Sequence, residues 1–491
     1  MAEVDALGVV FPFTGDRRST TALGREVVVD ALRAVDPVGA RLAAAETNWR
    51  TGYGEHFRRL VVAGLESSEA AQTIAAHGLA SVSERLSWAA LDGSETTLAE
   101  AIAARPGPAA AAPARDLVTE TVRGDGIPEH GVTLPYRGSR LDGDSLRRQL
   151  DDWTTRGIIE PSCAEAVATV AANPDWLDLS DLRLAVLGAG AEMGPLRALL
   201  RWGADVYAVD LARPQLWRGL LDDSKRYAGW LHLPARPGSG RLEDRAGADL
   251  VTEWPAVRQW LQDIEGRLVL GNYVYADGAD NVRVAGAVDA LTAAVMTDRP
   301  DTALAFLATP TDVFAVPRSV VTRSVAAYDS AKLSRALRGP MRALSGGRLL
   351  TRNYLPSADP GINDSVVPQQ GPNYLLAKRI QRWRAAVARA DGTTVSFTVA
   401  PPTRTRSVVK NRALAAAYAG AHRFGIEVFE PATANTLLAV LLVHDLRTGS
   451  GSSGQVWMDE ADHAAHGGLW TTAYEPRSAL GLAALLGVAA R

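Results

Sequence analysis

Three closely spaced glycines follow an apolar run near the middle of the chain, and this pattern could bind a phosphate group. After Leu184-Ala-Val-Leu the glycines stand at 188, 190 and 194, and helical apolar spacing begins around them. Glycine lets the backbone approach a pyrophosphate, and the free N–H groups of a helix N-terminus attract the anion. The stretch therefore predicts a strand, a tight turn and a helix start that hold a dinucleotide through Gly188, Gly190, Glu192, Met193 and Gly194.

A carboxylate stands where the second strand of such a unit would end. Asp205-Val-Tyr-Ala-Val-Asp210 closes twenty residues after Gly190. A carboxylate there accepts hydrogen bonds from both ribose hydroxyls and repels a 2′-phosphate, which favours NAD over NADP. Arg213, three residues further on, could pair with that phosphate, so NADP stays open as the cofactor.

Two tyrosine–lysine pairs with a spacing of four could move a proton. Tyr374 and Lys378 form one pair, and Tyr328 and Lys332 form the other. Residues four apart lie on one helix face, so the ammonium can lower the phenol pKa while the phenol passes a proton to or from a substrate oxygen. Only the first pair leads through a helix into a strand that ends in Ala-Pro, over 395–401. We therefore prefer the first pair and interpret the second as a solvated helix.

From here the sequence resembles the short-chain dehydrogenase/reductase (SDR) family, over roughly residues 181–470. In that family a Tyr-x-x-x-Lys helix leads into a strand that ends in Ala-Pro-Gly and a threonine. The resemblance implies that Tyr374 is the general acid/base and that Lys378 activates it and binds the cofactor ribose. It also implies that Thr405 lies at the cofactor and that Asp249, in Ala-Asp-Leu-Val-Thr, contacts the adenine.

The chain also departs from the family pattern. No serine follows the fifth strand, so Thr309 or Thr311 would have to hold the substrate oxygen, and Thr309 is preferred. The family has a further glycine two residues after the position of Gly194, where this chain has Leu196. Residues 312–372 form an insertion before the helix of Tyr374. Late in the chain, 429–443 resembles the family's last helix and 453–459 its final strand.

Strands that alternate with helices predict an α/β fold with a Rossmann-like, doubly wound parallel sheet. We expect strands at 205–210, 248–252, 267–275 and 302–309 beside the first one, with helices at 254–265 and 282–296. Residues 1–104 predict a mainly helical N-terminal domain, and the Pro- and Ala-rich stretch 105–115 a linker. Residues 116–180 would form a connecting subdomain, with two short strands joined by a turn, ahead of the Rossmann-like domain 181–491.

Composition excludes several classes of protein. The 491 residues are 47% hydrophobic and 22% charged, which is typical of a globular chain with a sizeable core. A net charge of −3 gives no sign of the positively charged surface that binds nucleic acid. No apolar run is long enough to span a membrane. One cysteine and the absence of a signal-peptide pattern favour the cytoplasm. The partners expected are a small-molecule or carrier-bound carbonyl or alcohol, with a homo-oligomer as an option.

Other functions remain as alternatives. A glycine turn with an acidic strand end also occurs in S-adenosylmethionine methyltransferases, but Val186 stands where those carry an acidic residue. The same fold could serve a non-redox dehydratase, epimerase or lyase that keeps NAD bound, or a nucleotide-binding protein without catalysis. No metal is expected, because the nearest group of potential ligands, Asp459, Asp462, His463 and His466, is typical of a solvated turn.

Overall fold

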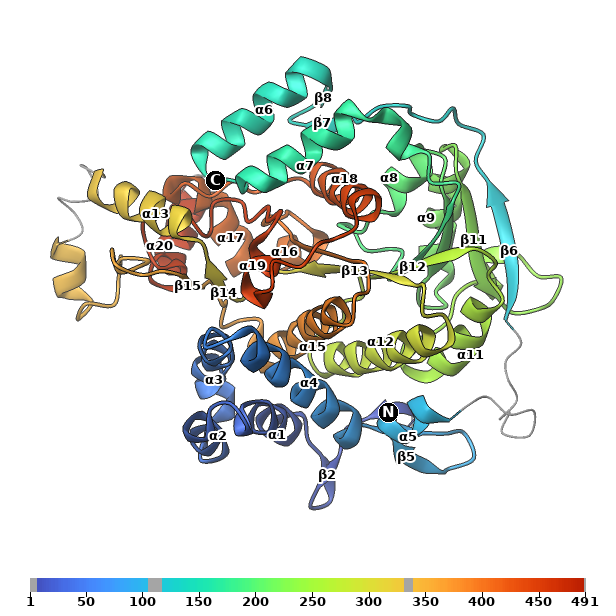
Figure 1. Cartoon of the computed structure of the whole chain (residues 1–491), viewed down its shortest axis with the longest axis horizontal. Helices are drawn as coiled ribbons and strands as arrows, with labels where there is room; N and C mark the ends of the chain where they lie inside the picture. Colours follow the sequence, from blue (N-terminus) through green and yellow to red (C-terminus); the bar gives the residue numbers. More distant parts are fainter. Residues whose placement is uncertain (1–6, 105–116, 331–338, 490–491) are drawn as a thin grey trace.

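The protein is organised around one seven-stranded, mostly parallel sheet. The computed structural model describes residues 7–104, 117–330 and 339–489. The strands lie in the order β16 (Val395–Val399), β13 (Ala303–Ala308), β12 (Arg267–Asn272), β9 (Leu182–Leu187), β10 (Asp205–Val209), β11 (Trp230–Ala235) and β6 (Val118–Arg123). All neighbours are parallel except β6, which runs antiparallel to β11 at the edge. The predicted α/β class and parallel sheet are confirmed (Figure 1).

The order of the strands reverses beside β9. From β9 the chain continues outward to β10 and β11, then returns to place β12 on the other side of β9, followed by β13 and β16. At such a point the connecting loops of β9 and β12 leave in opposite directions, which opens a crevice at the carboxyl ends of the strands. The glycine stretch follows β9, so it lies at this crevice.

Helices cover both faces of the sheet, as parallel strands require. One face carries α11 (Leu250–Gln262), α12 (Ala279–Asp298) and α15 (Gly371–Ala390). The opposite face carries α7 (Pro161–Ala172), α8 (Leu196–Arg201), α9 (Pro214–Lys225) and α18 (Pro431–Thr448). The central strands β9 and β13 are buried on both faces, so each is a nearly continuous apolar run in the sequence.

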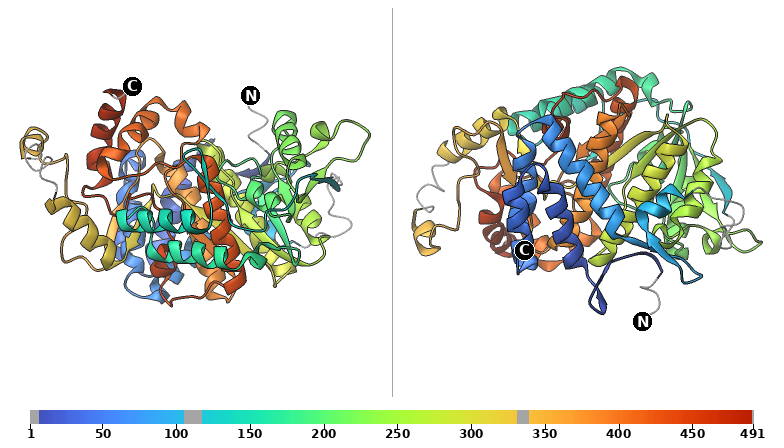
Figure 2. Two further views of the ribbon diagram at one scale, coloured as in Figure 1. Left: turned by 90° about the horizontal axis from the view of Figure 1, so that it is seen from above. Right: turned by 60° about the horizontal axis from the view of Figure 1, so that its bottom comes forward.

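The N-terminal helices pack on one another and cover the outer faces of α15 and α12, whose core they share. These helices are α1 (Thr20–Arg33), α2 (Pro37–Ala44), α3 (Trp49–Gly64), α4 (Ser68–Arg85) and α5 (Leu98–Ala103) (Figure 2). The contact is close because Gly78 of α4 has no side chain: a Cβ there would lie 2.4 Å from the Trp383 ring of α15. The short strands β1 (Gly8–Val10), β4 (Ser87–Ala89) and β5 (Glu95–Thr97) form a small sheet beside them, and β2 (Phe13–Thr14) pairs with β3 (Arg17–Arg18). The residues expected to form the linker lie outside the described residues.

The two strands expected between 117 and 135 do not pair with each other. The first is β6, which joins the central sheet, and the second is β7 (Leu134–Tyr136), which pairs with β8 (Ser139–Leu141). The residues that follow form two helices, α6 (Gly143–Arg156) and α7. Gly157, with φ 70°, ends α6 in the left-handed conformation that glycine adopts readily, so the chain turns there.

Two other predicted strands are helical. Residues 248–252 were expected to be the third strand, but Asp249 caps α11, whose first residues they become. The third parallel strand is instead β11, whose proline hides the strand pattern. Residues 453–459, expected to be a final strand, lead into α19 (Val456–Ala461). The Ser452 hydroxyl and the Ser453 backbone N–H donate to the Asp459 carboxylate, which favours a helix start rather than a strand.

A second group of elements extends beyond the end of the sheet. After β13 the chain forms β14 (Val313–Val316), α13 (Arg318–Ser330) and β15 (Gly361–Asp364), and β14 pairs with β15. After β16 come α16 (Arg406–Lys410), α17 (Arg412–Gly420) and, later, α20 (Pro476–Ala489). In α17 and α20, Gly420 and Gly487 allow close packing: a Cβ on either would lie within 2.0 Å of the other helix's backbone. Within the described residues, no helix is long and apolar enough to cross a membrane.

Candidate active site

The glycine turn lies at the crevice beside the backbone that follows β12. Gly188 has φ 81°, and a Cβ there would lie 2.9 Å from the carbonyl of Tyr273. A Cβ on Gly190 would lie 3.2 Å from both Asp210 and Leu216. These two glycines are therefore needed for conformation and for space, and they leave the loop open to a ligand.

The helix after the glycines begins later than expected. We expected it to start near Met193, but α8 begins at Leu196 and has only six residues. The turn 188–195 instead bonds internally, for example from the Gly194 N–H to the Ala191 carbonyl. Among the described residues, the N–H groups of Glu192 and Met193 have no protein acceptor. They are donors that could bind an anionic ligand at this turn.

Asp210 lies at the carboxyl end of β10, directly beside the turn. One carboxylate oxygen accepts the Gly190 N–H at 2.7 Å and the other accepts the Leu211 N–H at 2.7 Å. Burial raises the pKa of Asp210, and these two hydrogen bonds together with the charge of Arg213 oppose the rise. Each carboxylate oxygen has two lone pairs, so one on each remains for a ribose hydroxyl.

Three other residues expected at the cofactor gather around this turn. The Ala248 N–H donates to the Asp210 carbonyl at 2.9 Å, which holds Asp249 near the end of β10. Burial raises the pKa of Asp249, whose side chain caps α11 through the Val251 N–H. Glu192 accepts the N–H of Arg406 at 2.7 Å, and this contact closes the segment of Thr405 over the glycine turn.

The structure brings Tyr374 together with both candidate threonines. Tyr374 lies in the first turn of α15, partly buried, and Thr309 and Thr311 follow β13 at the same edge. The two threonine hydroxyls are 2.8 Å apart. Burial raises the pKa of Tyr374, and hydrogen bonds with Thr309 and Thr311 oppose the rise. The net rise is opposite to the lowering expected from a lysine, and it keeps the phenol protonated as a proton donor.

Lys378 lies one helical turn below Tyr374 and points toward the ends of β12 and β13. Its Nζ is 3.4 Å from the Leu307 carbonyl and 3.1 Å from Gln381 Oε1. Gln381 in turn donates to Asn272 at the end of β12. Burial lowers the pKa of Lys378 to about 8, with the charge of Asp312 opposing. An ammonium has three donors, so a third remains for a cofactor ribose.

A buried ion-pair network supports the helix that carries this pair. Asp312 lies 3.2 Å from Arg379 and 2.8 Å from Arg382, and Arg382 also binds Glu460 at 2.6 Å. Burial would raise the pKa of Asp312, but the charges of the two arginines outweigh it and lower the pKa. The sequence gives no local signal for Asp312, Gln381 or Asn272, because their partners are distant in the chain.

Tyr328, the tyrosine of the rival pair, lies away from the crevice. Tyr328 is on α13, where its ring packs 5.5 Å from Tyr474 and the Arg352 guanidinium lies 4.3 Å from its centroid. α13 covers no part of the central sheet (Figure 1). Lys332 lies outside the described residues.

An apolar pocket of about 70 Å³ lies beside Thr311, which neighbours Tyr374. Thr311 and Tyr418 form part of its wall, and Tyr418 is near enough to Tyr374 for their charges to interact. Most of the remaining wall is aliphatic and comes from α17, α20 and the segment between them, including Leu414, Ala417, Ile426, Val428, Leu469 and Leu480. The pocket is suited to an apolar ligand that reaches Thr311 with one end.

The ligands considered for a metal in the sequence do not come together as a group. Asp459 bonds Ser452 and Ser453, and the buried His466 lies 3.0 Å from Glu160. His463 instead meets His444 and Asp445, a grouping that the sequence did not suggest because eighteen residues lie between the two histidines.

The comparisons with known proteins identify no relative. The chain matches no protein-family model, no curated protein and no solved structure.

Proposed function

We propose that the protein is an NAD(P)-dependent oxidoreductase of the SDR type that acts on an apolar carbonyl compound or the corresponding alcohol. The observation that carries this proposal is the group at the end of β13. Tyr374, Lys378 and the Thr309–Thr311 hydroxyl pair converge at the edge of the sheet that holds the glycine turn and Asp210.

The strand order supports a dinucleotide site. Counted along the chain, the six parallel strands lie in the order 3-2-1-4-5-6, with the reversal between β9 and β12. This is the order of the Rossmann fold, in which the cofactor crosses the crevice at the reversal. The glycine turn, Asp210 and Asp249 lie on one side of that crevice, and Lys378 lies on the other.

The site residues divide the chemistry among them. The nicotinamide cofactor would supply or accept the hydride. Thr309 and Thr311 hold the substrate oxygen, and Tyr374 donates a proton to that oxygen in the direction of carbonyl reduction. Lys378 would bind the cofactor ribose through its remaining N–H donor. In alcohol oxidation the same groups act in reverse.

The pocket indicates the substrate. A carbonyl group held at Thr311 would direct the rest of its molecule between α17 and α20, where the wall is aliphatic. Burial of such a chain is favourable by about 0.8 kcal/mol per CH₂ group. We therefore propose a substrate with an extended apolar body, free or carrier-linked.

Ligand binding followed by hydride transfer tests the function. The purified chain is titrated with NADH, NADPH and S-adenosylmethionine, and then incubated with long-chain ketones and NADH deuterated at the nicotinamide C4. Support would be nicotinamide binding and deuterium at the product carbinol carbon. Binding of S-adenosylmethionine without nicotinamide cofactors would overturn the proposal. Turnover without net NADH consumption would favour the non-redox alternative.

The pH dependence of kcat/KM should reflect the protonation state of Lys378. Its ammonium is present below a pKa of about 8 and is lost above it, so kcat/KM for reduction should fall as the pH rises through about 8. Lys378→Arg keeps the charge and should move this fall to higher pH. A wild-type profile that stays level well above this pKa would contradict the role of the ammonium.

Asp210→Asn should weaken NADH binding by about 10- to 100-fold, because a hydrogen bond to a charged group is worth about 1.5–3 kcal/mol. NADPH binding should weaken less, since repulsion of its 2′-phosphate also disappears. Fluorescence titration measures both constants. Asp205→Asn, at the other end of the same strand, is the matched control and should change neither. Equal losses in the two variants would argue against a ribose contact.

A further inference from the structure

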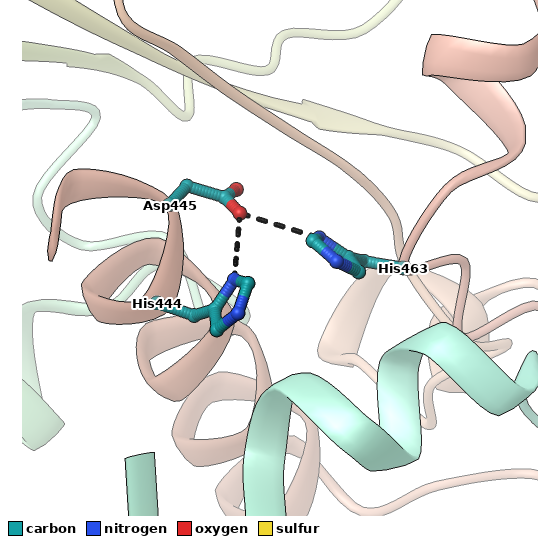
Figure 3. Close-up of side chains that lie close together, drawn as sticks. All are labelled: His444, Asp445 and His463. Carbon is teal, nitrogen blue, oxygen red and sulfur yellow. Dashed lines mark hydrogen bonds and ion pairs between the residues drawn. The ribbon is translucent and has the colours of Figure 1, made fainter. Parts of the chain in front are cut away.

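A group of two histidines and an aspartate lies at the amino end of β16, whereas Tyr374, Thr309 and Thr311 lie near its carboxyl end. His444 and Asp445 are on α18, and His463 follows α19 (Figure 3). Asp445 is buried and bonds Ser396, the second residue of β16, so the group lies at the amino end of that strand. The proposed reaction makes no use of these three side chains.

The distances from Asp445 to the two histidines are close to those around a tetrahedral ion. Zn²⁺ binds histidine nitrogen and carboxylate oxygen at about 2.0–2.2 Å, which places the ligand atoms of a tetrahedron about 3.3–3.6 Å apart. Asp445 Oδ1 lies 3.3 Å from His444 Nδ1 and 3.2 Å from His463 Nδ1. All three ligand atoms lie within 4.8 Å of one another. Both imidazoles point toward the same carboxylate oxygen (Figure 3).

Surrounding groups orient these three ligands. Ser396 donates to the other Asp445 oxygen at 2.6 Å, which turns Oδ1 toward the histidines. The second ring nitrogen of His463 lies 3.5 Å from the Asp462 carboxylate. A carboxylate behind a histidine is the usual support for a zinc ligand, because it fixes the ring and raises its basicity.

The backbone of His463 is held in an uncommon conformation. Its φ is 53°, in the left-handed region, and its N–H donates to Ser162 of α7 at 3.0 Å. Such a conformation persists where the surrounding structure fixes it, and it occurs often at ligand sites. Here it directs the imidazole back toward α18.

From this geometry we propose that His444, Asp445 and His463 bind one Zn²⁺ ion, with a water molecule in the fourth position. Two imidazoles and one carboxylate are a donor set that suits zinc. The ion would tie the segment after α19 to α18. Its place at the amino end of β16 separates it from the proton-transfer residues of the proposed reaction.

Metal analysis of the full chain, without an affinity tag, tests the site. After incubation with ZnCl₂ and dialysis against metal-free buffer, mass spectrometry should find about one zinc per chain. Cobalt in place of zinc should give the visible absorption of a tetrahedral ion. His444→Ala and His463→Ala should abolish both signals, and Asp462→Asn should weaken zinc binding by about 10- to 100-fold.

His130→Ala is the matched control, since His130 is exposed and lies outside the group. It should bind zinc like the wild type. If a ligand variant fails to fold, the wild-type titration with Co²⁺ still decides the matter. No stoichiometric zinc and no cobalt absorption in the folded wild type, or equal metal in the ligand and control variants, would overturn the proposal and leave a hydrogen-bonded group around Asp445.

Discussion

Tyr374→Phe is expected to lower kcat for the proposed carbonyl reduction by about 10²- to 10⁴-fold, the usual contribution of a general acid. The change removes one hydroxyl and leaves the ring in its contacts with Tyr275, 6.2 Å away, so the fold should be retained. The affinity for NADH should stay the same, because Lys378 and Asp210 are untouched. Steady-state kinetics and fluorescence titration measure the two quantities.

Tyr328→Phe is the control for this variant, because Tyr328 is the other tyrosine with a lysine four residues later. It should retain wild-type turnover. Loss of activity in Tyr328→Phe with full activity in Tyr374→Phe would show that the second pair carries the chemistry. Equal turnover in all three proteins would remove Tyr374 from the mechanism.

Asp312→Asn should destabilise the fold by about 3–5 kcal/mol, because it leaves a buried arginine charge without its partner. The side chains of Asp312, Arg379 and Arg382 are exposed by only 1%, 5% and 2%. Since the pKa of Asp312 is lowered in the fold, its contribution is full above its ordinary value of 3.8 and is lost on acidification toward the lowered value. Urea unfolding at neutral pH measures the loss.

The comparison variant is Asp144→Asn, which breaks an exposed pair with Arg147 on α6. Exposed pairs contribute little, so its unfolding midpoint should match that of the wild type. If Asp312→Asn were as stable as Asp144→Asn, the buried network would not be what holds α15 in place.

Local patterns predicted those parts of the fold that are governed by local chemistry. The strands at β9, β10, β12 and β13 were predicted because both faces are buried and each reads as an apolar run. β11 was missed because Pro234 interrupts its pattern, and only pairing with β6 and β10 makes it a strand. Residues 248–252 contain β-branched side chains, which favour a strand. They nevertheless lead into a helix, because the Asp249 side chain caps the N-terminus of α11.

Local patterns also predicted part of the candidate site. Tyr374 and Lys378 share a helix, and Thr309 ends a neighbouring strand, so their meeting follows from sheet topology. Asp312, Gln381 and Asn272 act through partners that are distant in sequence, and no local pattern reveals such contacts. The same reason hid His444, because its neighbour His463 belongs to a different segment of the chain.

The position of the N-terminal helices limits how two copies of this chain could associate. α3 and α4 cover the outer face of α15, and Trp383 is inserted against Gly78. That face is occupied within the chain, so a second subunit cannot pair through it. A homo-oligomer would have to use another surface. Deleting the first hundred residues would also expose a new apolar surface on α15, and the shortened chain should aggregate rather than form a smaller enzyme.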